Sequence, residues 1–155
     1  MRRLFWILFG VFLCLGLYLY WKTPSDWKVI GITDGDTITV LDSKKQEIKV
    51  RLWGIDAPEK KQSFGVNAKS SLSFKTFGKY VVLEVKSKDR YGRTVANVYV
   101  GNRWINKELV EDGMAWYYRQ YAKSPELEQA EHQARSAKRG LWSQQAVPPW
   151  EYRNK

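Results

Sequence analysis

The hydrophobic and polar positions of the chain change their period several times, and each change marks an element. Segments 27–33, 36–42 and 47–53 (WKVIGIT, DTITVLD and EIKVRLW) are rich in β-branched residues. Turn signals separate them, first Asp34-Gly35 and then the polar stretch SKKQ. Short runs of this composition between turn residues are typical of strands joined by hairpins. These segments therefore predict a three-stranded antiparallel meander.

A second hairpin is predicted further along the chain. Segments 80–87 and 94–100 (YVVLEVKS and TVANVYV) again favour strands, and they enclose the turn sequence DRYGR. Turn residues between two such runs indicate an antiparallel pair. With this hairpin, the predicted strands number five.

Three other segments have the period of a helix. The first runs from Gln62 to about Gly78, the second from Ile105 to Asp112, and the third from Pro125 to Arg139. The positions that define them are Ala68, Leu72 and Thr76 in the first helix, Gly113 as the stop of the second, and Leu127, Ala130, Ala134 and Ala137 in the third, with Gly140 as its cap. Five strands with a helix between the third and the fourth fit a small Greek-key barrel of the OB type. The predicted fold class is therefore α+β.

An uncharged apolar stretch precedes these elements. Residues 4–21 (LFWILFGVFLCLGLYLYW) would span roughly 27 Å as a helix, close to the ~30 Å hydrocarbon core of a bilayer. Two arginines precede the stretch and one lysine follows it directly, so the positive-inside bias sends the rest of the chain across the membrane. No small-x-small cleavage site ends the stretch, which favours an uncleaved transmembrane signal anchor over a cleaved, secreted form. In both cases we expect the domain outside the cytoplasm.

The chain of 155 residues is long enough for one compact domain and an appendage. We expect a signal anchor or signal peptide over residues 1–22 and a linker over 23–26. The domain would then cover residues 27–142, and an irregular C-terminal tail would cover 143–155.

Charge narrows the class of partner. The net charge is +10, from 26 Lys and Arg against 16 Asp and Glu. Such an excess is common in proteins that bind nucleic acid or an anionic membrane, although a merely basic surface gives the same count. Eight Trp, nine Tyr and six Phe suit base stacking as well as an ordinary core.

Two carboxylates are predicted to meet at one rim of the barrel. Asp36 opens the second strand and Asp56 lies just beyond the end of the third. In an antiparallel meander, the start of the second strand neighbours the end of the third. Two carboxylates, a main-chain carbonyl and water form an oxygen-only site that suits Ca²⁺ or Mg²⁺ and leaves positions open for substrate. The alternative for Asp36 is ordinary turn chemistry.

A third acid and two arginines complete the candidate chemistry. Glu59, which follows Pro58, could orient a water or take its proton as a general base, or it could cap a helix. Arg51 and Arg93 carry guanidinium forks that match pairs of phosphate oxygens and would stabilise charge at five-coordinate phosphorus. A single surface arginine, by contrast, is usually only solvated.

These residues carry a resemblance to a known family. The motifs ITDGDTITV, VRLWGIDAPE, DRYGRTVANVYV and NKELVEDGMAWYYRQY, in this order, closely resemble the staphylococcal-nuclease-like, or thermonuclease, domain. The similarity covers roughly residues 27–142. It implies an OB-fold barrel with three helices and a Ca²⁺-dependent hydrolysis of DNA and RNA to products with a 3′-phosphate.

The resemblance also implies a role for individual positions. The metal ligands fall on Asp36, Asp56 and the main-chain carbonyl of Ala57, where some members have threonine. The catalytic residues fall on Arg51, Glu59 and Arg93, and the substrate-binding residues on Arg90, Tyr91 and Tyr121. The chain departs from other members near Tyr121, where Arg and Gln precede the tyrosine, so Tyr117 or Tyr118 could line the base pocket instead.

Two functions of different classes remain. The first is a nuclease without sequence preference that is held in the bilayer by residues 4–21, or secreted if they are removed. The second is an OB-fold module of the same family that binds nucleic acid or a protein without cutting. Degenerate copies would be expected to lose a metal-binding acid or an arginine, and this chain retains all six positions, which favours the nuclease. No protein partner is inferred.

Overall fold

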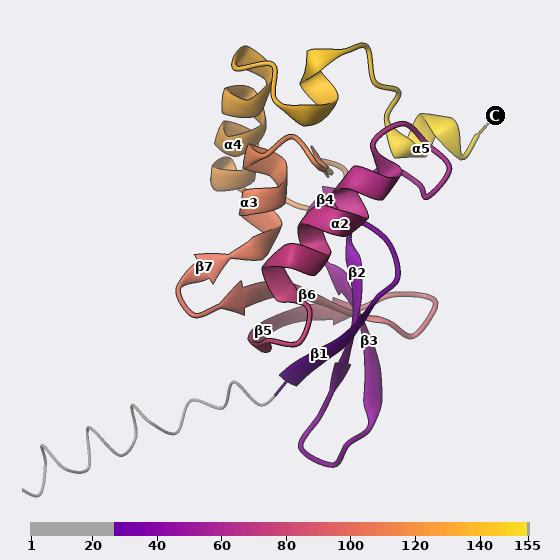
Figure 1. Ribbon diagram of the computed structural model, residues 1–155, viewed down its shortest axis with the longest axis vertical. Helices are drawn as coiled ribbons and strands as arrows, with labels where there is room; N and C mark the ends of the chain where they lie inside the picture. Colours follow the sequence, from indigo (N-terminus) through magenta and orange to yellow (C-terminus); the bar gives the residue numbers. More distant parts are fainter. Residues whose placement is uncertain (1–26, 155) are drawn as a thin grey trace, which may run out of the picture.

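A computed structural model describes residues 27–154 and begins with the predicted meander (Figure 1). Strands β1 (Trp27–Ile32), β2 (Thr37–Leu41) and β3 (Glu47–Leu52) pair antiparallel, with Thr37 opposite Arg51 at the end of the β2–β3 ladder. Alternate residues of a strand point to opposite faces, so one face of each strand supplies the core. The three-stranded meander is confirmed.

The second hairpin closes the sheet into a barrel. Strands β5 (Tyr80–Lys88) and β6 (Thr94–Val100) pair antiparallel, and β5 also pairs with β1. The remaining edge of β6 pairs in parallel with β3, which gives the closed order β3-β2-β1-β5-β6. Closure leaves these five strands without a free edge. The barrel interior is filled by buried side chains of all five strands: Val29, Ile38, Val40, Val50, Leu52, Val81, Ala96 and Val98.

The helices gather at one end of the barrel in Figure 1. They are α2 (Gly65–Thr76), α3 (Ile105–Glu111) and α4 (Pro125–Ser136). The predicted helical positions Ala68, Leu72 and Thr76 are all buried on α2. At the start of α4, the Ser124 hydroxyl accepts a hydrogen bond of 3.3 Å from the Leu127 amide, which satisfies a free donor of the first turn. The three predicted helices are therefore present.

Helix α4 is shorter than predicted. It ends at Ser136 instead of Arg139, and Ala137 is exposed instead of sharing the buried face. Lys138 has a φ of 52°, a left-handed conformation that ends the helix. The chain then turns so that the Leu141 amide donates to the Gly113 carbonyl at 2.9 Å. This contact, distant in sequence, sets the end of the helix ahead of Gly140.

Several short elements were not predicted. Three of them are two-residue strands, too short to show a period. Strand β4 (Ile55–Asp56) pairs with β8 (Trp116–Tyr117), which is far away in sequence, and β7 (Arg103–Trp104) forms a tight hairpin with the end of β6. A 3-10 turn, η1 (Gly140–Ser143), follows α4.

The segment predicted as an irregular tail, 143–155, contains a helix. Pro149–Tyr152 form α5, which begins directly after Pro148 and ends with the Arg153 amide donating to the Pro149 carbonyl at 2.9 Å. Proline suits the first turn of a helix because it has no amide hydrogen to leave unsatisfied. Tertiary contacts hold this short helix in place, and its position matters for the site described below.

The predicted anchor over residues 4–21 lies outside the described residues. Among residues 27–154, no helix is both long and apolar enough to cross a bilayer.

Candidate active site

Asp36 and Asp56 lie side by side at one rim of the barrel. Asp36 directly precedes β2, and its carbonyl accepts from the Leu52 amide at 2.8 Å, across the β2–β3 ladder. Asp56 ends β4, which the chain enters straight after β3. The Ala57 amide then donates to the Asp36 carboxylate at 2.8 Å. The strand geometry thus joins two acids that are twenty residues apart in sequence.

The loop that carries Asp36 is packed tightly against its neighbours. Gly35 is buried, and a Cβ added there would lie 2.7 Å from the Cβ atoms of both Ala57 and Ala68. Only a residue without a side chain allows so close an approach. Helix α2 therefore fixes the position of the Asp36 loop through this contact.

The Arg51 guanidinium bridges the two acids. Its Nη1 lies 2.8 Å from Asp36 Oδ2, and its Nη2 lies 2.9 Å from Asp56 Oδ1. The arginine side chain is 16% exposed, and those of Asp36 and Asp56 are 8% and 2% exposed. Charged hydrogen bonds in such a sheltered position are strong and directional. The two acids and the arginine thus form one rigid cluster.

One arginine does not fully compensate the acids. Burial raises the pKa of Asp36 to about 7 despite the opposing charge of Arg51, and the nearby carboxylates of Asp34 and Asp56 raise this pKa further. The largest cause of this shift is desolvation, which disfavours the charged form of a buried carboxyl group. Additional positive charge at this rim would stabilise the ionised acids.

The donor chemistry of the cluster fits a hard divalent cation. Asp36 and Asp56 supply carboxylate oxygens, and Ala57, whose carbonyl is the third candidate ligand, directly follows Asp56 in the chain. Such oxygen ligands are those that Ca²⁺ and Mg²⁺ prefer. Within residues 27–154 there is no group of three or more His, Cys, Asp or Glu side chains arranged around a common metal position.

Glu59 lies in the loop between β4 and α2. Its amide donates to the Gln62 side chain at 3.0 Å, and its carboxylate is 39% exposed. The helix-capping alternative does not hold, because α2 begins later, at Gly65, and Phe64 occupies its N-cap position. The Glu59 carboxylate is thus free of any role in starting the helix.

Arg93 is not in contact with the acids. Its Nε lies 2.6 Å from Asp89 Oδ2, within the turn between β5 and β6. In the parallel pairing of β3 with β6, Arg51 lies beside Val95, and Arg93 comes two residues before Val95 in the chain. Two positions correspond to about 7 Å along a strand and to the same face of the sheet. Arg93 is therefore paired within its own hairpin, two residues before the strand position that lies beside Arg51.

The predicted substrate-binding residues are exposed. Tyr91 is 69% exposed, and the guanidinium groups of Arg90 and Arg93 lie 4.9 and 5.6 Å from the centre of its ring. Tyr121 is 67% exposed, and its ring centre lies 4.7 Å from that of Tyr118. The two tyrosines thus offer accessible rings on two separate loops.

Arg153, which the sequence analysis did not select, reaches the acid cluster. Its Nη2 lies 2.8 Å from Asp56 Oδ2, and its Nη1 lies 2.7 Å from Glu59 Oε1. Hydrogen bonds to Asp56 and then to Glu59 hold the pKa of Arg153 above its usual value. No sequence signal could have found this contact, since Arg153 and Asp56 are 97 positions apart and no motif includes Arg153.

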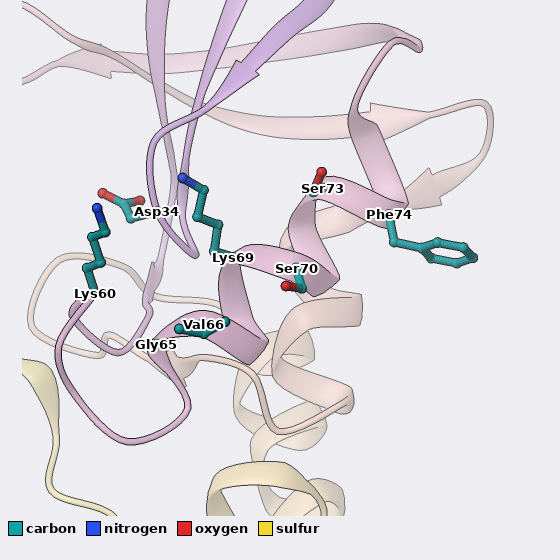
Figure 2. A pocket seen from close by; sticks show the side chains of 8 residues that line it. All are labelled: Asp34, Lys60, Gly65, Val66, Lys69, Ser70, Ser73 and Phe74. Atoms are coloured by element: carbon teal, nitrogen blue, oxygen red, sulfur yellow. The ribbon is translucent and has the colours of Figure 1, made fainter.

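A groove of about 580 Å³ lies along α2 and the loops that carry Asp34 and Lys60 (Figure 2). The side chains of Lys60 and Lys69 both extend toward Asp34, and Phe74 projects outward at the far end of α2 with 85% of its surface exposed. One residue of its lining, Lys60, directly follows Glu59 in the sequence. The full lining is Asp34, Lys60, Gly65, Val66, Lys69, Ser70, Ser73 and Phe74.

Comparison with known proteins gives a consistent family. Residues 49–144 match the family described as staphylococcal nuclease homologue. An uncharacterized endonuclease of Haemophilus influenzae is 46% identical over 122 residues, which cover 79% of this chain and 68% of that protein. An uncharacterized endonuclease of Escherichia coli O157:H7 is 42% identical, with coverages of 83% and 84%. A micrococcal nuclease of Shigella flexneri is also 42% identical, with coverages of 81% and 79%.

Proposed function

The chain belongs to the family of staphylococcal nuclease homologues, and from this premise we propose that it hydrolyses phosphodiester bonds of DNA and RNA with the help of Ca²⁺. The observation that carries the proposal is the cluster of Asp36, Asp56 and Arg51, in which the guanidinium lies 2.8 Å from one carboxylate and 2.9 Å from the other. A buried cluster of this kind costs desolvation energy and is weak evidence for stability alone. Its position at an open rim favours a chemical role.

Asp36, Asp56 and the carbonyl of Ala57 would hold the cation. When bound, Ca²⁺ supplies positive charge that polarises a phosphodiester and stabilises the charge developing on it. The support for this assignment is the pair of sheltered carboxylates at one rim, since carboxylate and carbonyl oxygens are the ligands that Ca²⁺ prefers.

The remaining residues act on water and phosphate. Glu59 accepts a proton from a water whose oxygen forms a new bond to phosphorus, while the bond from phosphorus to the 5′-oxygen breaks. Solvent protonates the departing 5′-oxygen, and the product keeps a 3′-phosphate. Arg51 and Arg93 bind the phosphoryl oxygens and stabilise their added charge, which requires Arg93 to exchange its contact with Asp89 for the substrate.

Exposed rings and cations would bind the rest of the substrate. Arg90 and Tyr91 suit a phosphate and an adjoining sugar or base, and Tyr121 suits a stacked base. The groove lined by Lys60 and Lys69 offers a continuation for the phosphate backbone.

The groove yields a test of substrate binding. Changing Lys69 to alanine should weaken binding of a single-stranded oligonucleotide and lower the slope of log K against log salt by about 0.7, the value for one lost phosphate contact. Fluorescence anisotropy over a range of salt concentrations measures both. Lys28→Ala is the control, since Lys28 is exposed on β1 and lines no part of the groove. Equal slopes in the two variants would exclude the groove from the binding path.

The nuclease proposal is tested by metal-dependent digestion. The full chain, kept in a non-ionic detergent because residues 4–21 are apolar, is incubated with DNA or RNA and Ca²⁺, and then with excess chelator. We expect cleavage with Ca²⁺, none with chelator, and 3′-phosphate ends on the products. Intact nucleic acid under both conditions, combined with measurable binding, would establish a non-cutting module instead.

We also propose that residues 4–21 anchor the chain in a membrane, with the domain outside the cytoplasm. The support is the uncharged length of the stretch and the arginines before it. Fractionation of membranes, followed by protease treatment of intact cells, tests both the anchoring and the side on which the domain lies.

A further inference from the structure

The segment after residue 143 folds back over the candidate active site. The Gln144 side chain donates to the Ser63 hydroxyl at 2.7 Å, and the Gln62 side chain donates to the Val147 carbonyl. In Figure 1, α5 accordingly lies next to the loop that precedes α2. Pro149, the first residue of α5, is buried. These contacts tie α5 to the loop that also carries Glu59.

Aromatic packing orients α5. The Trp150 ring stacks on Tyr118 with centres 5.2 Å apart and an angle of 3° between the planes, and it meets Trp116 edge-on at 6.3 Å. Such pairs contribute beyond the area that they bury. Residues three apart share one face of a helix, so Trp150 on this platform brings Arg153 to the acid cluster.

Arg153 takes up the oxygen atoms that a cation would need. Asp56 Oδ1 is held by Arg51 and Oδ2 by Arg153, so both oxygens of this carboxylate have a guanidinium partner. The second nitrogen of Arg153 lies on the Glu59 carboxylate. One side chain therefore covers an acid assigned to the metal and the acid assigned as the base.

We propose that α5 is an autoinhibitory latch, in which the Arg153 guanidinium competes with a divalent cation for Asp56 and blocks Glu59. This proposal rests on the proposed function of the same site. Binding of the cation displaces Arg153 from Asp56, because a second positive group so close to the ion is repelled. Release of Arg153 then leaves the Glu59 carboxylate free to accept a proton from the attacking water.

The latch is built to open. The Arg153 and Glu59 side chains are 43% and 39% exposed, so solvent screens the ion pair between them and keeps it weak. Helix α5 has only four residues and depends on tertiary contacts for its stability. A latch that is closed in about 90% of molecules lowers the apparent Ca²⁺ affinity about tenfold, because only the open fraction binds.

The first test measures Ca²⁺ affinity and not activity. Isothermal titration calorimetry of the full chain in non-ionic detergent should give a Kd about tenfold lower for Arg153→Ala than for the unchanged chain, as the latch population implies. Lys61→Ala is the matched control, since it removes one exposed positive charge two residues after Glu59. Its Kd should change less than about twofold, because salt screens exposed charges.

The second test follows the latch itself. Hydrogen exchange measured by mass spectrometry should show faster exchange at residues 149–154 in saturating Ca²⁺, with α4 unchanged. An Arg153→Ala affinity equal to or weaker than that of the unchanged chain would overturn the latch, as would unaltered exchange at 149–154. Where the unchanged chain still binds Ca²⁺ and cuts, only the latch has failed. Absence of Ca²⁺ binding in every variant would overturn both the latch and the metal part of the proposed function.

Discussion

Replacing Glu59 with glutamine should lower the turnover number by about 10²- to 10⁴-fold, the range expected when a general base is removed. Glutamine keeps the size and the hydrogen-bonding reach of glutamate but cannot accept a proton from water. The carboxylate lies beside the cluster and does not cap α2, so the change leaves the fold intact. Initial rates at saturating Ca²⁺ and substrate measure the effect.

Binding measurements separate the chemical role of Glu59 from its other contacts. The Kd for an oligonucleotide should change little, because Glu59 is assigned to the reaction and not to affinity. Glu47→Gln is a suitable control, since Glu47 is an exposed acid on β3 away from the rim. Turnover of Glu59→Gln within about twofold of the unchanged chain would remove Glu59 as the base.

Changing Arg51 to lysine should have the second largest effect. The guanidinium bridges Asp36 and Asp56 at 2.8 and 2.9 Å, and a lysine ammonium cannot reproduce this planar fork. We expect turnover to fall by about 10²- to 10³-fold, as when one donor to a developing oxyanion is lost. The free energy of unfolding should fall by about 2 kcal/mol, the scale of a lost hydrogen bond to a charged group.

Arg103→Lys provides the matched control. Arg103 also forms two contacts to one carboxylate, that of Glu108, but on the surface and away from the rim. Its replacement should leave turnover and unfolding nearly unchanged. Steady-state kinetics and urea denaturation report the two quantities. If Arg51→Lys kept full turnover, charge alone would suffice and the fork geometry would have no part in the reaction.

Local pattern was enough to predict most of the scaffold. Each strand of the barrel is a short β-branched run between turn residues, and α2 shows its buried face as Ala68, Leu72 and Thr76. The neighbourhood of Asp36 and Asp56 followed from the same local information, because the pairing of two adjacent strands fixes which of their ends meet. Contacts between neighbours in sequence are the part of a fold that a pattern can reveal.

Contacts between distant segments could not be predicted in this way. The β4–β8 pairing depends on two residues from each of two remote loops, too few to produce a period. Arg153 reaches Asp56 through the packing of Trp150, although the aromatic tail reads simply as core or as irregular chain. The Arg93 guanidinium is paired with Asp89, a residue of the same turn, and this pairing competes with any contact between Arg93 and a substrate.

The parallel seam between β3 and β6 also bears on how the protein folds. Val50 and Thr94 meet there from distant parts of the chain, whereas the two hairpins on either side form from neighbouring residues. A pairing between remote segments costs loop-closure entropy before its contacts form. The two hairpins and α2 are therefore favoured to form earlier. Arg51 lies on this seam and Arg93 directly precedes it. Newly made chains would therefore place Arg51 of β3 beside β6 only in a late stage of folding, after both hairpins have formed.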